Sequence, residues 1–193
     1  MKSKNKSTKI FIISGPSGVG KTTVARGVLE KLPFLKTTVT YTTRTQRLGK
    51  KEDKTIIHVN QSEFRKKIKT GDFIEWALVH GNLYGTNAKN LKNQLAKNNL
   101  LMNIDVQGAL QIKKKMPRQT RLIFLKTKTI QELIQRIERR EKMPPAVLAL
   151  RLKNARREMA LAHQYDYIVL NEKNQINRTI TQVVSLIRQE LDS

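Results

Sequence analysis

The chain has 193 residues, enough for one domain with a buried core, and its 38 Lys and Arg outweigh 15 Asp and Glu to give a formal charge of +23. It contains no cysteine, which excludes disulfides, cysteine-liganded zinc and a cysteine nucleophile. The basic residues are spread along the chain and only 5% of residues are aromatic, so the charge favours a solvated surface over nucleic-acid binding.

No apolar run approaches the roughly 18 residues of a membrane span, and the apolar run at 10–13 is too short for a signal-peptide core. We therefore expect a cytoplasmic protein with no membrane partner, and no nucleic-acid partner despite the charge.

Strand and helix patterns alternate along the chain. Strands are expected at 9–14, 37–41, 55–59, 73–79, 83–84, 100–104, 121–125 and 167–170. Helices are expected at 24–32, 62–70, 87–97, 107–115, 130–141, 146–162 and 176–191. This alternation predicts an α/β fold with a doubly wound parallel sheet. The short strands between residues 37 and 84 are expected to form a separate small lobe of mixed or antiparallel strands.

The segment GPSGVGKT at 15–22 matches the phosphate loop G-x-x-x-x-G-K-[ST] and stands between an expected strand and an expected helix. Its glycines allow successive N–H groups to point into one concavity, and the helix N-terminus adds further donors. We expect Lys21 to reach the β- and γ-phosphates of a nucleoside triphosphate and the Thr22 hydroxyl to ligate Mg²⁺. The residues expected to bind the triphosphate here are Gly15, Pro16, Ser17, Gly18, Val19, Gly20, Lys21, Thr22 and Thr23.

Arginines form a second signal. Arg44 and Arg47 lie in a basic loop, and Arg136, Arg139, Arg140 and Arg151 lie on or beside a helical hairpin interrupted by two prolines. Phosphoryl transfer requires charge stabilisation on three oxygens, and the guanidinium group supplies a fixed fork of donors. Each arginine alone is compatible with a solvated surface charge, but the spacing of the set predicts phosphoryl transfer.

With these motifs the chain resembles the guanylate kinases, P-loop nucleoside monophosphate kinases that transfer the γ-phosphate of ATP to GMP in purine metabolism. The motifs that carry the resemblance are GPSGVGKTT (15–23), TTRTQRLG (42–49), FIEWA (73–77), GNLYGT (81–86), NIDVQGA (103–109), RIERRE (136–141) and RLKNA (151–155). The resemblance implies a single domain over 1–193, with a core at about 8–36, 98–128 and 164–193. It also implies a GMP-binding lobe at about 37–90, a helical lid at about 129–163, and ATP with Mg²⁺.

The resemblance further implies how GMP is held. Arg44, Arg47 and Tyr84 would bind the GMP phosphate. Glu75 would accept hydrogen bonds from guanine N1–H and the exocyclic amine, a donor pair that adenine lacks because its N1 is an acceptor. Thr40 and Thr86 would supply hydroxyls to the base, and Asp105 would lie beside the guanine edge.

It implies the catalytic groups in the same way. Lys21, Arg44, Arg136, Arg140 and Arg151 would stabilise the transferring phosphoryl group, and Asn171 would lie near the adenine of ATP. Trp76, the only tryptophan, is expected in the core of the lobe.

Four positions depart from the family's usual pattern. Asn103 replaces the first carboxylate of an Asp-x-Asp pair associated with the metal, and Ile56 replaces a tyrosine that contacts the GMP phosphate. Arg139 and Glu141 replace lid glycines. We therefore expect an intact fold and GMP pocket with lower turnover than usual.

Other interpretations remain open at this point. Asn103 and Ile56 are compatible with a catalytically weakened nucleotide-binding or scaffold module. The charge alone suggests a nucleic-acid-associated ATPase. A kinase for a phosphorylated sugar is a lesser alternative, against which Glu75 and Thr86 favour a purine.

Overall fold

The computed structural model describes residues 8–46, 55–140 and 143–193 of the chain. Its strands are β1 (Ile10–Ser14), β2 (Thr40–Thr42), β3 (Ile56–His58), β4 (Phe73–Val79), β5 (Asn82–Asn87), β6 (Leu100–Asn103), β7 (Thr120–Lys126) and β8 (Tyr167–Leu170). Its helices are α1 (Lys21–Lys31), α2 (Gln61–Lys69), α3 (Ala88–Leu95), α4 (Val106–Lys115), α5 (Ile130–Arg140), α6 (Pro145–Ala160) and α7 (Ile176–Asp192), with a short 3₁₀ turn at Ala162–Gln164.

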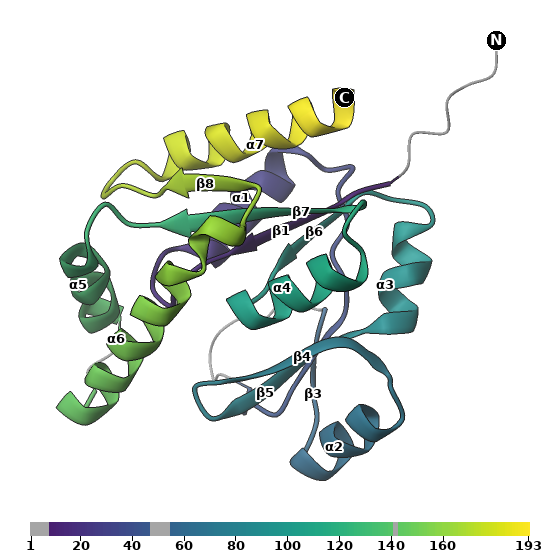
Figure 1. Cartoon of the computed structure of the whole chain (residues 1–193), viewed down its shortest axis with the longest axis horizontal. Helices are drawn as coiled ribbons and strands as arrows, with labels where there is room; N and C mark the ends of the chain where they lie inside the picture. Colours follow the sequence, from purple (N-terminus) through teal and green to yellow (C-terminus); the bar gives the residue numbers. More distant parts are fainter. Residues whose placement is uncertain (1–7, 47–54, 141–142) are drawn as a thin grey trace.

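Four parallel strands form the core sheet in the order β6-β1-β7-β8 (Figure 1). β1 lies inside this sheet, and all five of its residues are buried. Its side chains alternate between the two faces, as the period of a strand requires. Phe11 and Ile13 pack with α1 and α7, whereas Ile10 and Ile12 pack with α3 and α4. Helices therefore cover both faces, which confirms the predicted doubly wound parallel sheet.

The small lobe is a second four-stranded sheet in the order β3-β2-β5-β4. β2 pairs with β3 in parallel, whereas the β2–β5 and β5–β4 pairs are antiparallel. The sheet is therefore mixed, as predicted. Figure 1 shows it below the core sheet, with α2 at its far end and the α5–α6 hairpin on the other side of the molecule.

Two strand predictions in the lobe miss an observed end by three residues, whereas the strand expected at 55–59 is one residue shorter at each end. The strand expected at 37–41 begins at Thr40, because residue 36 still pairs with Leu100 of the core and Val39 N–H donates to Asn90 Oδ1. The strand expected at 83–84 extends to Asn87, although it contains a glycine. Glycine suits position 85 because the rings of Phe73 and Phe64 pack closely there: their atoms would lie only 3.0–3.1 Å from an added Cβ.

Trp76 does not lie in the lobe core, contrary to the prediction. Its side chain is 41% exposed, and Leu78, two residues further along the strand, is 58% exposed. Glu75 and Ala77, the two residues that flank Trp76 in β4, are both buried. Because successive side chains of a strand point to opposite faces, this places Trp76 outward.

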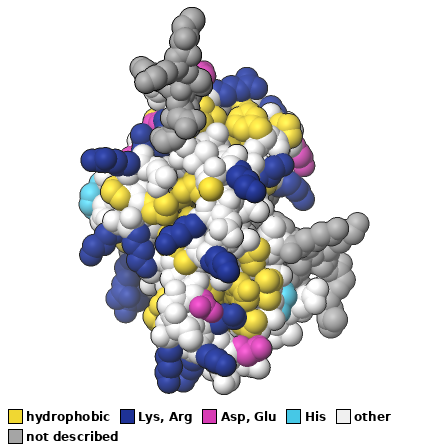
Figure 2. Space-filling view, turned by 90° about the vertical axis from the view of Figure 1, so that its right-hand side faces the viewer, with side chains coloured by type: hydrophobic (Ala, Val, Ile, Leu, Met, Phe, Trp, Pro, Cys, Tyr) yellow, Lys and Arg dark blue, Asp and Glu magenta, His cyan; other side chains and the backbone are white. Residues whose placement is uncertain are grey.

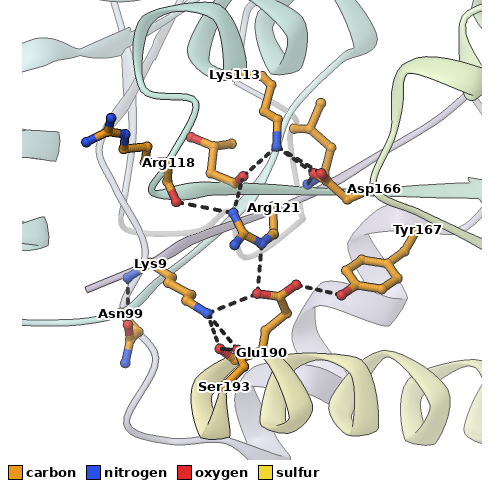
Figure 3. Close-up of polar contacts among 11 residues, drawn as sticks. Lys9, Asn99, Lys113, Arg118, Arg121, Asp166, Tyr167, Glu190 and Ser193 are labelled. Atoms are coloured by element: carbon orange, nitrogen blue, oxygen red, sulfur yellow. Dashed lines mark hydrogen bonds and ion pairs between the residues drawn. The ribbon is translucent and has the colours of Figure 1, made fainter. Parts of the chain in front are cut away.

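A network of partly buried ion pairs joins the starts of β1 and β7 to the end of α7 (Figure 3). The Glu190 carboxylate accepts from Lys9 Nζ at 3.0 Å, Arg121 Nε at 2.7 Å and Tyr167 OH at 2.6 Å. Beside it, Asp166 accepts from Lys113 Nζ at 2.9 Å. Burial opposes the Glu190 charge, but the hydrogen bonds from Tyr167 and Lys9 outweigh it and lower the pKa of Glu190. This network ties the C-terminal helix to the sheet.

On the face shown in Figure 2, the lysine and arginine side chains are scattered and do not form one stripe. Apolar side chains lie between them. Among the described residues, no helix has the length and apolar character needed to cross a membrane.

Candidate active site

The phosphate loop connects β1 to α1 through glycines that hold left-handed backbone conformations. Gly15, Gly18 and Gly20 have φ values of 137°, 86° and 98°. A Cβ on Gly15 would lie 2.2 Å from the Leu125 carbonyl oxygen, so this position also requires glycine for space. The predicted helix began at Val24, but α1 begins at Lys21, directly after the last loop glycine. Lys21 and Thr22 therefore lie in the first turn of a helix, where unpaired N–H groups and the helix dipole attract anions.

Lys21 bends back over the loop. Its Nζ donates to the carbonyl of Gly15 at 2.6 Å and to that of Pro16 at 3.0 Å. The Thr22 hydroxyl accepts from Asn103 Nδ2 at 3.2 Å. Asn103 ends β6, which is adjacent to β1 in the sheet, so the strand order brings the position that departs from the family pattern onto the expected metal ligand.

Two predicted site residues, Asn171 and Arg136, donate hydrogen bonds to the backbone of the phosphate loop. The buried Asn171 donates from Nδ2 to the Val19 carbonyl at 2.7 Å and accepts on Oδ1 from Thr179 Oγ1 at 3.0 Å. Arg136 of α5 donates to the Asn171 carbonyl at 2.7 Å and to the Val19 carbonyl at 3.4 Å. The expected location of Asn171 near adenine stays a prediction, because its described contacts are with the protein.

A cavity of about 250 Å³ lies between the phosphate loop and the lobe. Of the predicted residues, its wall contains Gly15, Ser17, Lys21, Thr22, Thr40, Glu75, Tyr84 and Asp105. Strands of both sheets meet at this cavity: β6 supplies Asn103, β2 supplies Thr40, and β4 supplies Glu75. An adjoining cavity of about 540 Å³ shares Thr22, Thr40 and Tyr84, and Ile56 lies in its wall.

Glu75 is the most unusual group in the first cavity. It is 2% exposed, and its Oε1 accepts from Thr86 Oγ1 at 2.6 Å. Its Oε2 is buried without a hydrogen-bond partner among the described residues. A buried acceptor of this kind is rare in folded proteins and indicates a place for a ligand donor. Burial raises the pKa of Glu75 to about 7; the Thr86 hydrogen bond opposes that rise and the Asp105 charge adds to it.

Asp105 and Glu158 add two further carboxyl groups to the same cavity. Asp105 caps α4, with Oδ1 accepting from the N–H groups of Gln107 at 2.8 Å and Gly108 at 3.3 Å, and burial raises its pKa. Burial also raises the pKa of Glu158 to about 7, while the Lys21 charge opposes this rise. Glu75 and Glu158, which line the same cavity as Lys21, therefore give it a charge that changes close to neutral pH.

The remaining predicted residues are placed less directly. Thr86 is buried against Glu75, and Arg44 follows β2, with its carbonyl accepting from His58 Nδ1 at 2.6 Å. Arg151 lies on α6. Arg140 is the last residue of α5, and the position of its side chain is not described. Arg47 and Glu141 lie outside the described residues.

Glu158 and His80 also line the cavity, although neither was predicted as a site residue. Glu158 lies more than 50 residues after Asp105, the nearest other wall residue in the sequence, and no local motif marks it. Its helical spacing from Arg151 was the only available signal, since residues seven apart share one face of a helix. Among the described residues no group of His, Cys, Asp and Glu has the arrangement of a metal site.

Comparisons with known proteins agree with this geometry. The family model described as guanylate kinase matches residues 7–190. A guanylate kinase of Bartonella henselae is 38% identical over 94% of this chain and 81% of its own length, and one of Bartonella quintana is 42% identical over 93% and 78%. The crystal structure of guanylate kinase from Anaplasma phagocytophilum superposes with a TM-score of 0.78 at 30% identity, covering 98% of this chain and 89% of that one. The chain belongs to the guanylate kinase family.

Proposed function

We propose that this chain transfers the γ-phosphate of ATP to GMP, giving ADP and GDP, and that it does so in the cytoplasm. One observation carries the proposal. A single cavity joins the phosphate-loop residues Lys21 and Thr22 to the buried carboxylate of Glu75, whose Oε2 has no hydrogen-bond partner among the described residues. The family membership and the cavity thus lead to the same reaction.

The lobe side of the cavity accounts for the choice of guanine. Ionised Glu75 offers two acceptors to guanine N1–H and the exocyclic amine, and Thr86 fixes one of these oxygens in place. If adenine were bound, a buried carboxylate oxygen of Glu75 would face the N1 of adenine, which is also an acceptor, and this mismatch would be costly. Thr40 and Asp105 complete the base site, and the same site is expected to accept dGMP, because these contacts do not involve the sugar.

The loop side accounts for phosphoryl transfer. The loop N–H groups and Lys21 would hold the β- and γ-phosphates, while Arg44, Arg47 and Tyr84 hold the phosphate of GMP in line with them. Arg136, Arg140 and Arg151 on the hairpin, as a lid, would stabilise charge on the transferring group and exclude water. The GMP phosphate is already anionic, so the reaction requires no general base.

Mg²⁺ fits the cavity only with help from the nucleotide. Thr22 supplies one hydroxyl oxygen and Asn103 can supply only a neutral amide oxygen, whereas Mg²⁺ in kinases is usually held by one or two carboxylates together with phosphates. When bound, the ion would neutralise negative charge on the phosphates of the nucleotide. We therefore propose that Thr22 holds Mg²⁺ and that Asn103 makes turnover slower than the roughly 1–100 s⁻¹ typical of kinases.

The test measures coupled ADP release with ATP, Mg²⁺ and each of GMP, AMP, CMP and UMP, for the wild type and for Asn103→Asp. Of the four nucleoside monophosphates, we expect only GMP to support turnover. In Asn103→Asp we expect the turnover number to rise about tenfold, since the variant restores a negative charge beside the metal. A wild-type turnover within the usual kinase range would refute the proposed effect of Asn103. If GMP binds by calorimetry without turnover, the protein is a nucleotide-binding module instead.

A further inference from the structure

One face of α4 is bonded to the outer edge of β4 on both sides of Glu75. Within the described residues β4 is the edge strand of the lobe sheet, so the backbone groups that point away from β5 need other partners. Gln111 supplies them for Trp76: its Nε2 donates to the Trp76 carbonyl at 2.9 Å, and its Oε1 accepts from the Trp76 N–H at 3.3 Å. Lys115 Nζ, one turn further along α4, donates to the carbonyl of Ile74.

The same face of α4 also fits against the carboxylate itself. Gly108 lies three and seven residues before Gln111 and Lys115, a spacing that places all three on one side of the helix. A Cβ on Gly108 would lie 2.4 Å from Glu75 Oε2 and 3.0 Å from its Cδ. The helix backbone therefore forms the wall behind Glu75, while its two longer side chains hold the strand.

Glu75 needs this support because its own sheet does not fix it fully. The register of β4 against β5 shifts between Phe73 and Glu75, and such irregularities change the direction of neighbouring side chains. Thr86 holds Oε1, but Oε2 has no fixed partner among the described residues. A displacement of about 1 Å would misplace both acceptors relative to a planar base.

We propose that Gln111 and Lys115 are positioning residues for Glu75: they fasten β4 to α4, so that the carboxylate meets the guanine edge in one geometry. The inference rests on the proposed function for its substrate, GMP. Asp105, which caps the same helix, lines the cavity. The helix that positions the base-binding carboxylate therefore begins at the cavity wall and connects the lobe to the core.

Lys115 has an electrostatic effect in addition. The charged and polar groups that face Glu75 are Asp105 and Lys115 from α4 and the Thr86 hydroxyl from β5, and Lys21 and Glu158 line the same cavity. The Lys115 charge favours the ionised form of Glu75, whereas the Asp105 charge disfavours it. Removal of the Lys115 ammonium should therefore raise the pKa of Glu75 further.

The first experiment compares Gln111→Met and Lys115→Met with Lys114→Met, a control that removes the same charge from an exposed position on the same helix. For both test variants we expect the KM for GMP to rise about tenfold, with kcat and the KM for ATP changed by less than about twofold. Lys114→Met should leave all three constants unchanged. An unchanged KM for GMP, or a parallel rise in both KM values, would overturn the inference.

The second experiment needs no substrate and so separates this inference from the proposed function. Carboxyl NMR of the unliganded protein should show Glu75 titrating at higher pH in Lys115→Met than in Lys114→Met. Hydrogen exchange of the Trp76 amide should be about tenfold faster in Gln111→Met than in the wild type, because its acceptor is lost. Equal titration in the two lysine variants, or unchanged exchange, contradicts the inference; absence of GMP turnover in the wild type contradicts only the proposed function.

Discussion

Replacement of Glu75 by glutamine should make the unliganded protein more stable and its reaction with GMP much slower. Glutamine keeps the shape of the side chain and an oxygen for the Thr86 hydroxyl, but it carries no charge. Its second group is an amide NH₂ directed at the donors of guanine. We expect kcat/KM for GMP to fall by at least about 100-fold, since buried donors would face each other.

The stability effect follows from the titration of Glu75. Between pH 4.5 and about 7 the folded protein keeps a proton that the unfolded chain releases, so stability falls as the pH rises through this range. The difference between these two pKa values corresponds to about 3 kcal/mol at 1.36 kcal/mol per pKa unit. Glutamine removes this loss, so Glu75→Gln should gain up to about 3 kcal/mol above pH 7 and almost nothing below pH 4.5.

Urea unfolding followed by circular dichroism from pH 4.5 to 8.5 measures this directly. Glu138→Gln is the matched control, because it makes the same chemical change at an exposed position of α5 and should alter stability little at any pH. A gain that is independent of pH, or a loss of stability at pH 8, would refute the assignment of Glu75 as a buried carboxyl group with a raised pKa. An unchanged kcat/KM for GMP would refute its role in base recognition.

Three further substitutions test the scaffold of the site. Gly15→Ala should cost about 3 kcal/mol or more in urea unfolding, because its Cβ would overlap the Leu125 carbonyl at a φ of 137°. Asn171→Ala should raise the KM for ATP about tenfold, since the Val19 carbonyl loses the nearer of its two donors and keeps only Arg136 at 3.4 Å. Glu190→Gln should reduce stability by about 1–3 kcal/mol at pH 7. That loss should shrink as the pH falls below about 4.5, because the pKa of Glu190 is lowered by folding and its contribution disappears on protonation.

Each of these has its own contradicting result, and Gly15→Ala also has a matched control. Gly81→Ala, with a φ of 82° and no atom within 4 Å of the added Cβ, should cost only about 1 kcal/mol, and an equal cost at Gly15 would remove the steric argument. An unchanged KM for ATP in Asn171→Ala would show that the phosphate loop keeps its conformation without the hydrogen bond from Asn171. A Glu190→Gln effect that persists at pH 3 would indicate lost packing rather than lost ion pairs.

Local sequence was sufficient where one segment supplies both the structure and the chemistry. The phosphate loop was predicted in place, since its glycines, Lys21 and Thr22 are consecutive and lie between two regular elements. The core strands were likewise predicted, because a fully buried strand such as β1 is recognisable as an apolar run. The family's motifs added Glu75 and Thr86 as a base-binding pair, and the structure joins them by a hydrogen bond of 2.6 Å.

Tertiary structure alone decided what depends on partners distant in the chain. Whether Trp76 faces inward depends on which side of β4 carries Glu75, and the start of β2 depends on how long residue 36 stays paired with the core. Glu158 enters the cavity only because α6 folds back over the loop, and Gln111 is significant only because α4 lies along the free edge of β4. Sequence records the chemical types of these residues; burial and contact between distant segments, which set pKa values and orientation, exist only once the chain has folded.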